Sequence, residues 1–93
     1  MRQWSAMPRI EKEVTIRNIQ GLHARPADMF VQIASKYNSH ITVKKDRETV
    51  NGKSIMGILM LGAQQKSNIL LIAEGDDANE AINELEGFLT KHE

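Results

Sequence analysis

The chain has 93 residues, of which 41% are hydrophobic and 4% aromatic, and this composition suits one small domain with a core of aliphatic side chains. Its 12 basic and 12 acidic residues give a formal net charge of +0, which argues against nucleic acid as the main partner, because nucleic-acid binders usually carry a basic excess. The chain has no cysteine, which excludes disulfides, thiolate catalysis and cysteine-based zinc sites, and no apolar run approaches the about 20 residues that span a bilayer.

The N-terminal segment, residues 1–11, is predicted to be a flexible extension that precedes a domain of residues 12–93. Its first residues lack the apolar segment of a secretory signal peptide. We therefore expect a cytoplasmic protein that does not insert into a membrane.

The first half of the domain alternates between strand and helix patterns. Apolar and polar residues alternate over residues 13–17, which predicts a half-buried strand. Helical spacing follows over residues 24–37, where Pro26 falls in the first turn and its missing N–H costs nothing. Residues 40–44 and 49–51 then predict a hairpin around a polar turn.

The second half predicts a short helix, a strand and a longer helix. Ser54 is a favoured N-cap for a helix over residues 55–61, which ends near Gly62. Residues 68–74 are mostly apolar and predict a central strand. A turn and cap at residues 75–77 precede a clear amphipathic helix from residue 78 to residue 89.

The element order β-α-β-β-α-β-α predicts the fold class. A strand, a helix and then a hairpin indicate an α+β domain. We expect an open-faced β-sandwich, in which a four-stranded antiparallel sheet carries three helices on one face.

The most informative motif is Gly21-Leu22-His23-Ala24-Arg25-Pro26-Ala27, which marks a loop that turns into a helix. It lies in the basic part of the chain, because residues 1–53 hold 10 Lys and Arg against 5 Asp and Glu. A helix N-terminus has unpaired N–H groups and a positive dipole end, which suit a phosphate or another anion. The backbone N–H groups of Ala24 and Arg25 and the guanidinium of Arg25 are therefore candidate phosphate donors.

This motif and a second one, Asn51-Gly52-Lys53-Ser54-Ile55-Met56-Gly57-Ile58-Leu59, together resemble the HPr family. These are the histidine-containing phosphocarrier proteins of the bacterial phosphoenolpyruvate-dependent sugar phosphotransferase system. The resemblance covers about residues 12–91, and it implies the HPr-like form of the predicted fold. It also implies a monomer that acts as a phosphoryl-transfer intermediate, rather than as a free-standing enzyme.

The resemblance implies a role for each part of the first motif. Enzyme I, charged by phosphoenolpyruvate, would phosphorylate Nδ1 of His23, and the group would pass to a IIA domain of a sugar permease. Arg25 would stabilise the transferring charge. No cofactor is implied. His40 and His92 are expected to be incidental, and no set of His and carboxylates has metal-ligand spacing, so we predict no metal site.

Ser54 has a structural and a regulatory interpretation. Serine is simply a preferred N-cap. In many HPr proteins the matching serine is phosphorylated by a dedicated kinase, HPr kinase/phosphorylase, which regulates carbon metabolism and weakens transfer through the histidine. The resemblance therefore implies a regulatory phosphosite at Ser54, with a transcription regulator as a further partner.

Residues of the second motif are also candidate contacts for partners. Apolar residues at helical spacing usually form core, but a short helix cannot bury every side. By resemblance, Ile55, Met56 and Leu59 form an exposed patch that docks enzyme I, IIA domains and the kinase. Lys53 is a candidate for a basic rim around it.

Two other functions remain open. In the nitrogen-related branch, a similar carrier feeds a regulatory IIA protein, although the Ser-Ile-Met-Gly sequence at Ser54 favours the sugar branch. In some bacteria an HPr-like protein has lost the histidine and acts as a purely regulatory binding module. The presence of His23 with Arg25 argues against that function here.

Overall fold

The computed structural model describes residues 8–91. Its elements follow the predicted order β-α-β-β-α-β-α. They are β1 (Arg9–Thr15), α1 (Ala24–Ser35), β2 (His40–Lys45), β3 (Glu48–Asn51), α2 (Ile55–Leu61), β4 (Asn68–Glu74) and α3 (Ala78–Leu89).

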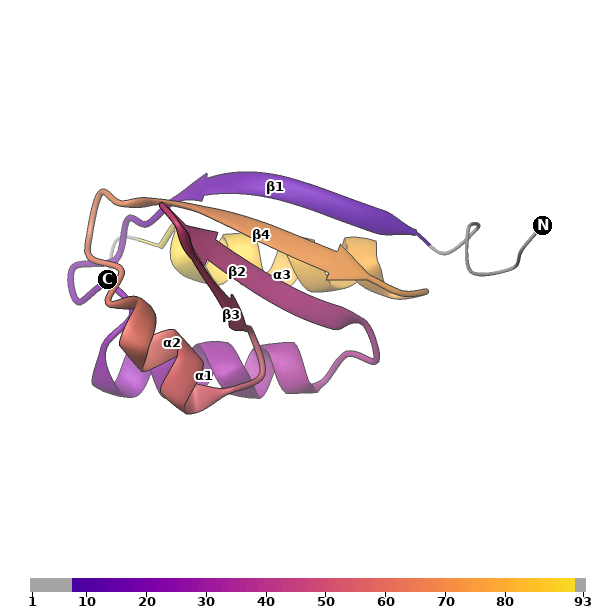
Figure 1. Ribbon diagram of the computed structural model, residues 1–93, viewed down its shortest axis with the longest axis horizontal. Coiled ribbons are helices and arrows are strands. Elements are labelled where there is room, and N and C mark those ends of the chain that lie inside the picture. Colours follow the sequence, from indigo (N-terminus) through magenta and orange to yellow (C-terminus); the bar gives the residue numbers. More distant parts are fainter. Residues whose placement is uncertain (1–7, 92–93) are drawn as a thin grey trace.

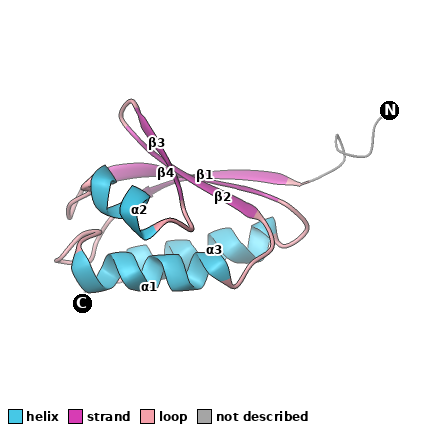
Figure 2. Ribbon diagram, turned by 60° about the horizontal axis from the view of Figure 1, so that its bottom comes forward, coloured by secondary structure: helices cyan, strands magenta, loops and turns pink. Residues whose placement is uncertain are grey.

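The strands form one antiparallel sheet in the order β1-β4-β2-β3. β4 lies inside the sheet, as its apolar sequence predicts, and Ile69, Leu71 and Ala73 are buried. All three helices cover one face of the sheet (Figures 1 and 2). The open-faced α+β architecture predicted from the sequence is confirmed.

β1 begins at Arg9, before residue 12, where the sequence analysis placed the start of the domain. Residues 9–11 continue the register with β4, in which Arg9 lies opposite Glu74. The guanidinium of Arg9 lies 2.8 Å from carboxylate oxygens of both Glu74 and Glu11. Strand pairing therefore extends the domain toward the N-terminus. Residues 1–7 of the predicted extension and His92 lie outside the described residues.

The core is aliphatic, as the composition predicts, and Phe30 is its largest side chain. It lies between the sheet and the helices, with the predicted face of α3 buried against it. No helix among residues 8–91 is long and apolar enough to cross a membrane.

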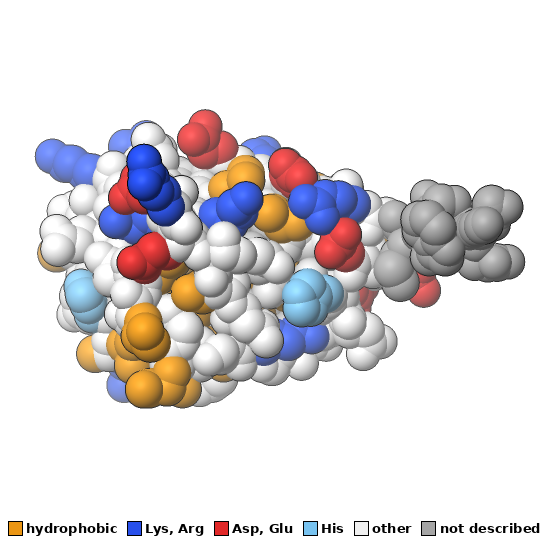
Figure 3. Space-filling model, viewed as in Figure 1, with side chains coloured by type: hydrophobic (Ala, Val, Ile, Leu, Met, Phe, Trp, Pro, Cys, Tyr) orange, Lys and Arg blue, Asp and Glu red, His pale blue; other side chains and the backbone are white. Residues whose placement is uncertain are grey.

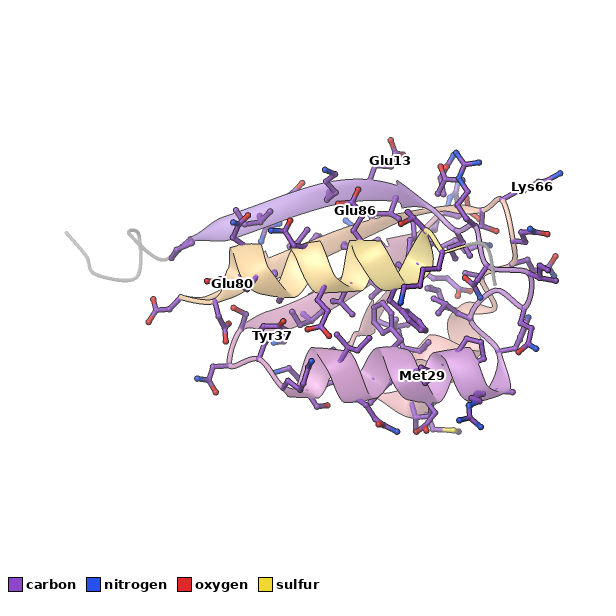
Figure 4. The ribbon with its side chains drawn as sticks, turned by 180° about the vertical axis from the view of Figure 1, so that it is seen from behind. Glu13, Met29, Tyr37, Lys66, Glu80 and Glu86 are labelled. Atoms are coloured by element: carbon purple, nitrogen blue, oxygen red, sulfur yellow. The ribbon has the colours of Figure 1, made fainter. Side chains whose placement is uncertain are left out.

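The C-terminal end of α1 is tied to α3 by a polar cluster (Figure 4). The Tyr37 hydroxyl donates a hydrogen bond of 2.5 Å to Glu84 Oε1, and Lys36 Nζ lies 2.7 Å from Glu84 Oε2. The hydrogen bond to Glu84 raises the pKa of Tyr37 to about 12. The hydrogen bonds from Lys36 and Tyr37 lower the pKa of Glu84 below its ordinary value.

The Asp77 side chain holds the loop between α1 and β2 through hydrogen bonds. It stands at the predicted cap position of α3, but its carboxylate makes no bond to its own helix. It accepts hydrogen bonds from the backbone N–H of Asn38 (2.8 Å) and of Ser39 (3.0 Å), and from the Ser39 hydroxyl (2.5 Å). These bonds lower the pKa of Asp77, and the bond from the Ser39 hydroxyl has the largest effect.

Candidate functional site

The loop before α1 is held by backbone and side-chain hydrogen bonds. Leu22, which is fully buried, donates its N–H to the Ala63 carbonyl at 2.8 Å. Asn18 Nδ2 donates to the Gly21 carbonyl at 2.8 Å, and the Gly21 N–H donates to the Asn18 carbonyl at 3.2 Å. The residue that follows Leu22, His23, is therefore presented by a fixed loop.

Glycine is the only residue type that fits position 21 without strain. Its φ is +64°, in the left-handed region that favours glycine. A Cβ atom there would lie 2.5 Å from the Ala63 carbonyl oxygen and 2.8 Å from Gln64 Cα, both backbone atoms. The first residue of the motif thus lets the loop lie directly against the segment after α2.

His23 is the N-cap of α1, with φ −116° and ψ 156°. Its carbonyl oxygen accepts the first helical hydrogen bond, from the Ala27 N–H at 3.4 Å. The imidazole is exposed and makes no capping hydrogen bond. Helix geometry therefore places a free imidazole over the first turn of α1, as the motif predicts.

The backbone around His23 supports anion binding. Ala24 and Arg25 are the first two helical residues, so their N–H groups have no acceptor within the helix, and Pro26 has no N–H to leave unpaired. Ala24 has a φ of +45°, which costs a non-glycine residue about 1 kcal/mol. This local strain sits at the position where the motif predicts a phosphate.

The Arg25 side chain extends beside a pocket of about 220 Å³. Pro26, Met29 and Phe88 give the pocket an apolar wall, while Asn18 and Lys91 add polar groups. Arg25 forms no ion pair with any residue of the described range 8–91. Lys91 is a second cation next to the site that the sequence analysis missed, because nothing in its local sequence links the end of α3 to the start of α1.

Ser54 is the N-cap of α2, as predicted. Its Oγ accepts a hydrogen bond of 3.1 Å from the Gly57 N–H, and its carbonyl oxygen accepts one of 3.0 Å from the Ile58 N–H. The side chain is half-buried. The helix ends at Gly62, whose φ of +63° is left-handed.

Lys53 lies in a different environment from the one the sequence suggests. Its Nζ donates a hydrogen bond of 2.6 Å to the Tyr37 carbonyl, just past the end of α1. A cation near the C-terminal end of a helix also interacts favourably with the helix dipole. In this structure the ammonium of Lys53 is thus bonded within the chain, rather than placed on an open rim.

Four apolar side chains of α2 form a surface that we call the α2 patch: Ile55 (38% exposed), Met56 (64%), Leu59 (39%) and Met60 (73%). The opposite side of the helix, with Ile58 and Leu61, is buried. Figure 3 shows hydrophobic side chains gathered over α2 and the neighbouring α1. The sequence predicted the exposure of the first three side chains but missed Met60, because its spacing also fits a core position.

The two motifs come together because α1 and α2 pack against each other (Figure 2). An exposed imidazole, an unpaired guanidinium and an apolar patch thus lie on adjoining helices. Among residues 8–91, no three His, Asp or Glu side chains gather as metal ligands would. The fold and site together define a small open-faced sandwich with an exposed histidine at a helix N-terminus.

Comparison with known proteins agrees with this description. Residues 10–91 match the family described as PTS HPr component, phosphorylation site. The HPr-like protein Crh of Halalkalibacterium halodurans is 45% identical over 82 residues, which cover 88% of this chain and 98% of that protein. The crystal structure of the phosphocarrier protein HPr from Bacillus anthracis superposes with a TM-score of 0.86 at 42% identity, and the match covers 87% of this chain and 96% of that one. The chain belongs to the HPr family.

One relative is described as a dimer. A crystal structure of Crh from Bacillus subtilis, described as a swapped, intertwined dimer, has a TM-score of 0.70 and 39% identity, over 86% of this chain and 92% of that one. The monomeric state expected for this chain therefore stays a prediction.

Proposed function

We propose that this HPr-family chain is a phosphocarrier that accepts a phosphoryl group on His23 from phospho-enzyme I. The group then passes to IIA domains of sugar permeases, in the cytoplasm and with the chain as a monomer. The observation that carries the proposal is the exposed imidazole of His23 at the N-terminus of α1, with Arg25 next to it.

The site residues have separable roles in this reaction. The lone pair of neutral Nδ1 of His23 attacks phosphorus, and the bond between phosphorus and the donor breaks with its electron pair left on the donor. The N–H groups of Ala24 and Arg25 donate hydrogen bonds to the phosphoryl oxygens and so stabilise their negative charge. Arg25 neutralises charge that spreads over those oxygens in the transition state. The α2 patch supplies the apolar contact with each partner.

The test is transfer of label from phosphoenolpyruvate in the presence of enzyme I. An acid-labile label is expected on the wild-type chain and on the control variant His40→Ala. His40 is the first residue of β2. His23→Ala should take up none. Label that persists in His23→Ala would overturn the proposal.

A second candidate function is regulation through Ser54. Its support is the position of Ser54 directly before the α2 patch, together with the similarity to HPr-like Crh proteins. A phosphate there adds a dianion and strong acceptor oxygens next to the docking surface. HPr kinase/phosphorylase with ATP should give an acid-stable label that Ser54→Ala loses, and a transcription regulator is a candidate reader of it.

These two tests identify a purely regulatory module, and the protein that receives the phosphoryl group identifies a nitrogen-branch carrier. A purely regulatory binding module would take the acid-stable label on Ser54 and no acid-labile label on His23. A nitrogen-branch carrier would take both labels from its own enzymes. It would then transfer the phosphoryl group of His23 to a regulatory IIA protein rather than to a permease.

A further inference from the structure

Every methionine that the structure describes has an exposed side chain. Met29 is 41% exposed, Met56 64% and Met60 73%. The buried hydrophobic core of residues 8–91 consists of Ile, Leu, Val, Ala and Phe side chains, without a methionine. Methionine is usually among the buried residue types, so this distribution sets the three residues apart.

These methionines lie on the two helices that carry the proposed phosphoryl site and the α2 patch. Met56 and Met60 are one helical turn apart in the α2 patch. Met29 lies on α1 (Figure 4), where it lines the same pocket as Arg25. Because α1 and α2 pack together, all three methionines lie on the pair of helices to which the proposed function assigns phosphoryl transfer and docking.

An exposed thioether is open to oxidation. The chain has no cysteine, so its methionines hold all of its sulfur. A peroxide transfers one oxygen atom to the sulfur lone pair, its O–O bond breaks, and the peroxide leaves as water or an alcohol. The sulfur loses two electrons and becomes a sulfoxide, a polar hydrogen-bond acceptor that methionine sulfoxide reductases convert back to the thioether.

We propose that Met29, Met56 and Met60 form a reversible oxidation site, at which conversion to the sulfoxide by a peroxide weakens docking and so slows phosphoryl transfer through His23. The inference rests on the proposed function. The free protein tolerates the change because none of the three methionines belongs to its buried core. In a docked complex, each buried sulfoxide needs a hydrogen-bond donor that an apolar contact does not supply.

The experiment compares the full chain before and after treatment with hydrogen peroxide, with enzyme I and phosphoenolpyruvate as the assay. Peptide mass spectrometry reports which methionines gain oxygen. We expect oxidation at all three positions, a rise of about tenfold in the KM for the chain as phosphoryl acceptor, a smaller change in kcat, and recovery after treatment with the reductases. Thermal unfolding should stay unchanged, which separates a docking effect from a loss of fold.

The control is the variant Met29→Leu/Met56→Leu/Met60→Leu, compared with itself before and after peroxide. It retains Met1 and Met7 and keeps an apolar side chain of similar size at each changed position. Its KM should not respond to peroxide. A wild-type KM that peroxide leaves unchanged, or a triple variant that responds as strongly as wild type, overturns this inference. Failure of untreated wild-type chain to accept any phosphoryl group would instead overturn the proposed function.

Discussion

The ammonium of Lys53 is hydrogen-bonded at 2.6 Å to the backbone carbonyl of Tyr37. This contact joins the segment before α2 to the end of α1, and Ser54 is the next residue along the chain. The same stretch around Tyr37 is tied to α3 through Glu84. Polar contacts thus link the segment before α2, the end of α1 and α3.

The first prediction concerns Lys53. Lys53→Ala should lower the free energy of unfolding by about 1 kcal/mol, because it leaves a carbonyl at a helix end without its donor. Lys44→Ala, on an exposed position of β2, should have almost no effect. Urea unfolding measures both. If Lys53→Ala kept full stability but raised the KM of the enzyme I reaction, Lys53 would belong to the docking rim instead.

Gly21 provides a second prediction. Gly21→Ala should destabilise the fold by about 1–3 kcal/mol, because a Cβ would lie 2.5 Å from the Ala63 carbonyl at a φ of +64°. It should also slow transfer to His23, because the loop that presents the imidazole must shift. Gly87→Ala is the matched control, since a Cβ there meets nothing within 4 Å, and it should stabilise α3 by about 0.5–1 kcal/mol. Equal stabilities for the two variants would contradict this account of the loop.

Tyr37 should make stability depend on alkaline pH. Its pKa is raised in the folded protein to about 12 from an ordinary value of 10.0, chiefly by the hydrogen bond to Glu84. A raised pKa means that the contribution is complete below pH 10 and is lost as pH rises toward 12. Tyr37→Phe should therefore lower the free energy of unfolding by about 1 kcal/mol at pH 7. The difference between the unfolding free energies of the variant and of wild type should become smaller above pH 10. Chemical unfolding of both proteins across this range measures the difference in their unfolding free energies, and a difference that does not change with pH would contradict the raised pKa of Tyr37.

The N-cap of α2 can be tested apart from any modification. Ser54→Ala removes the acceptor of the Gly57 N–H and should destabilise the protein by about 1 kcal/mol. Ser54→Asn keeps a capping side chain and should recover most of that loss. Transfer to His23 should continue in both, because neither variant changes the first turn of α1. Equal unfolding free energies for Ser54→Ala and wild type would show that the serine hydroxyl does not act as a cap.

The sequence predicted the element order, the central place of β4 and the two helix starts at His23 and Ser54, because apolar periodicity and capping residues are local signals. It placed the start of the domain at residue 12, whereas β1 begins at Arg9, since the pairing of Arg9 with Glu74 joins residues far apart in the chain. The bond from Lys53 to the Tyr37 carbonyl and the pocket that Lys91 shares with Arg25 likewise join residues far apart in the chain. Local patterns do not carry that information, whereas motif resemblance identified the histidine, the serine and most of the α2 patch.

The most direct test of the account is to locate the phosphoryl group on the chain after reaction with enzyme I and phosphoenolpyruvate. Phosphorus–proton correlation NMR of the product should show coupling to one imidazole only, with the phosphoryl group on Nδ1 and the shifted backbone amides confined to the His23 loop and the first turn of α1. A spectrum with the phosphoryl group on another residue, or an unchanged His23 imidazole in a product that carries phosphate, would contradict the central claim.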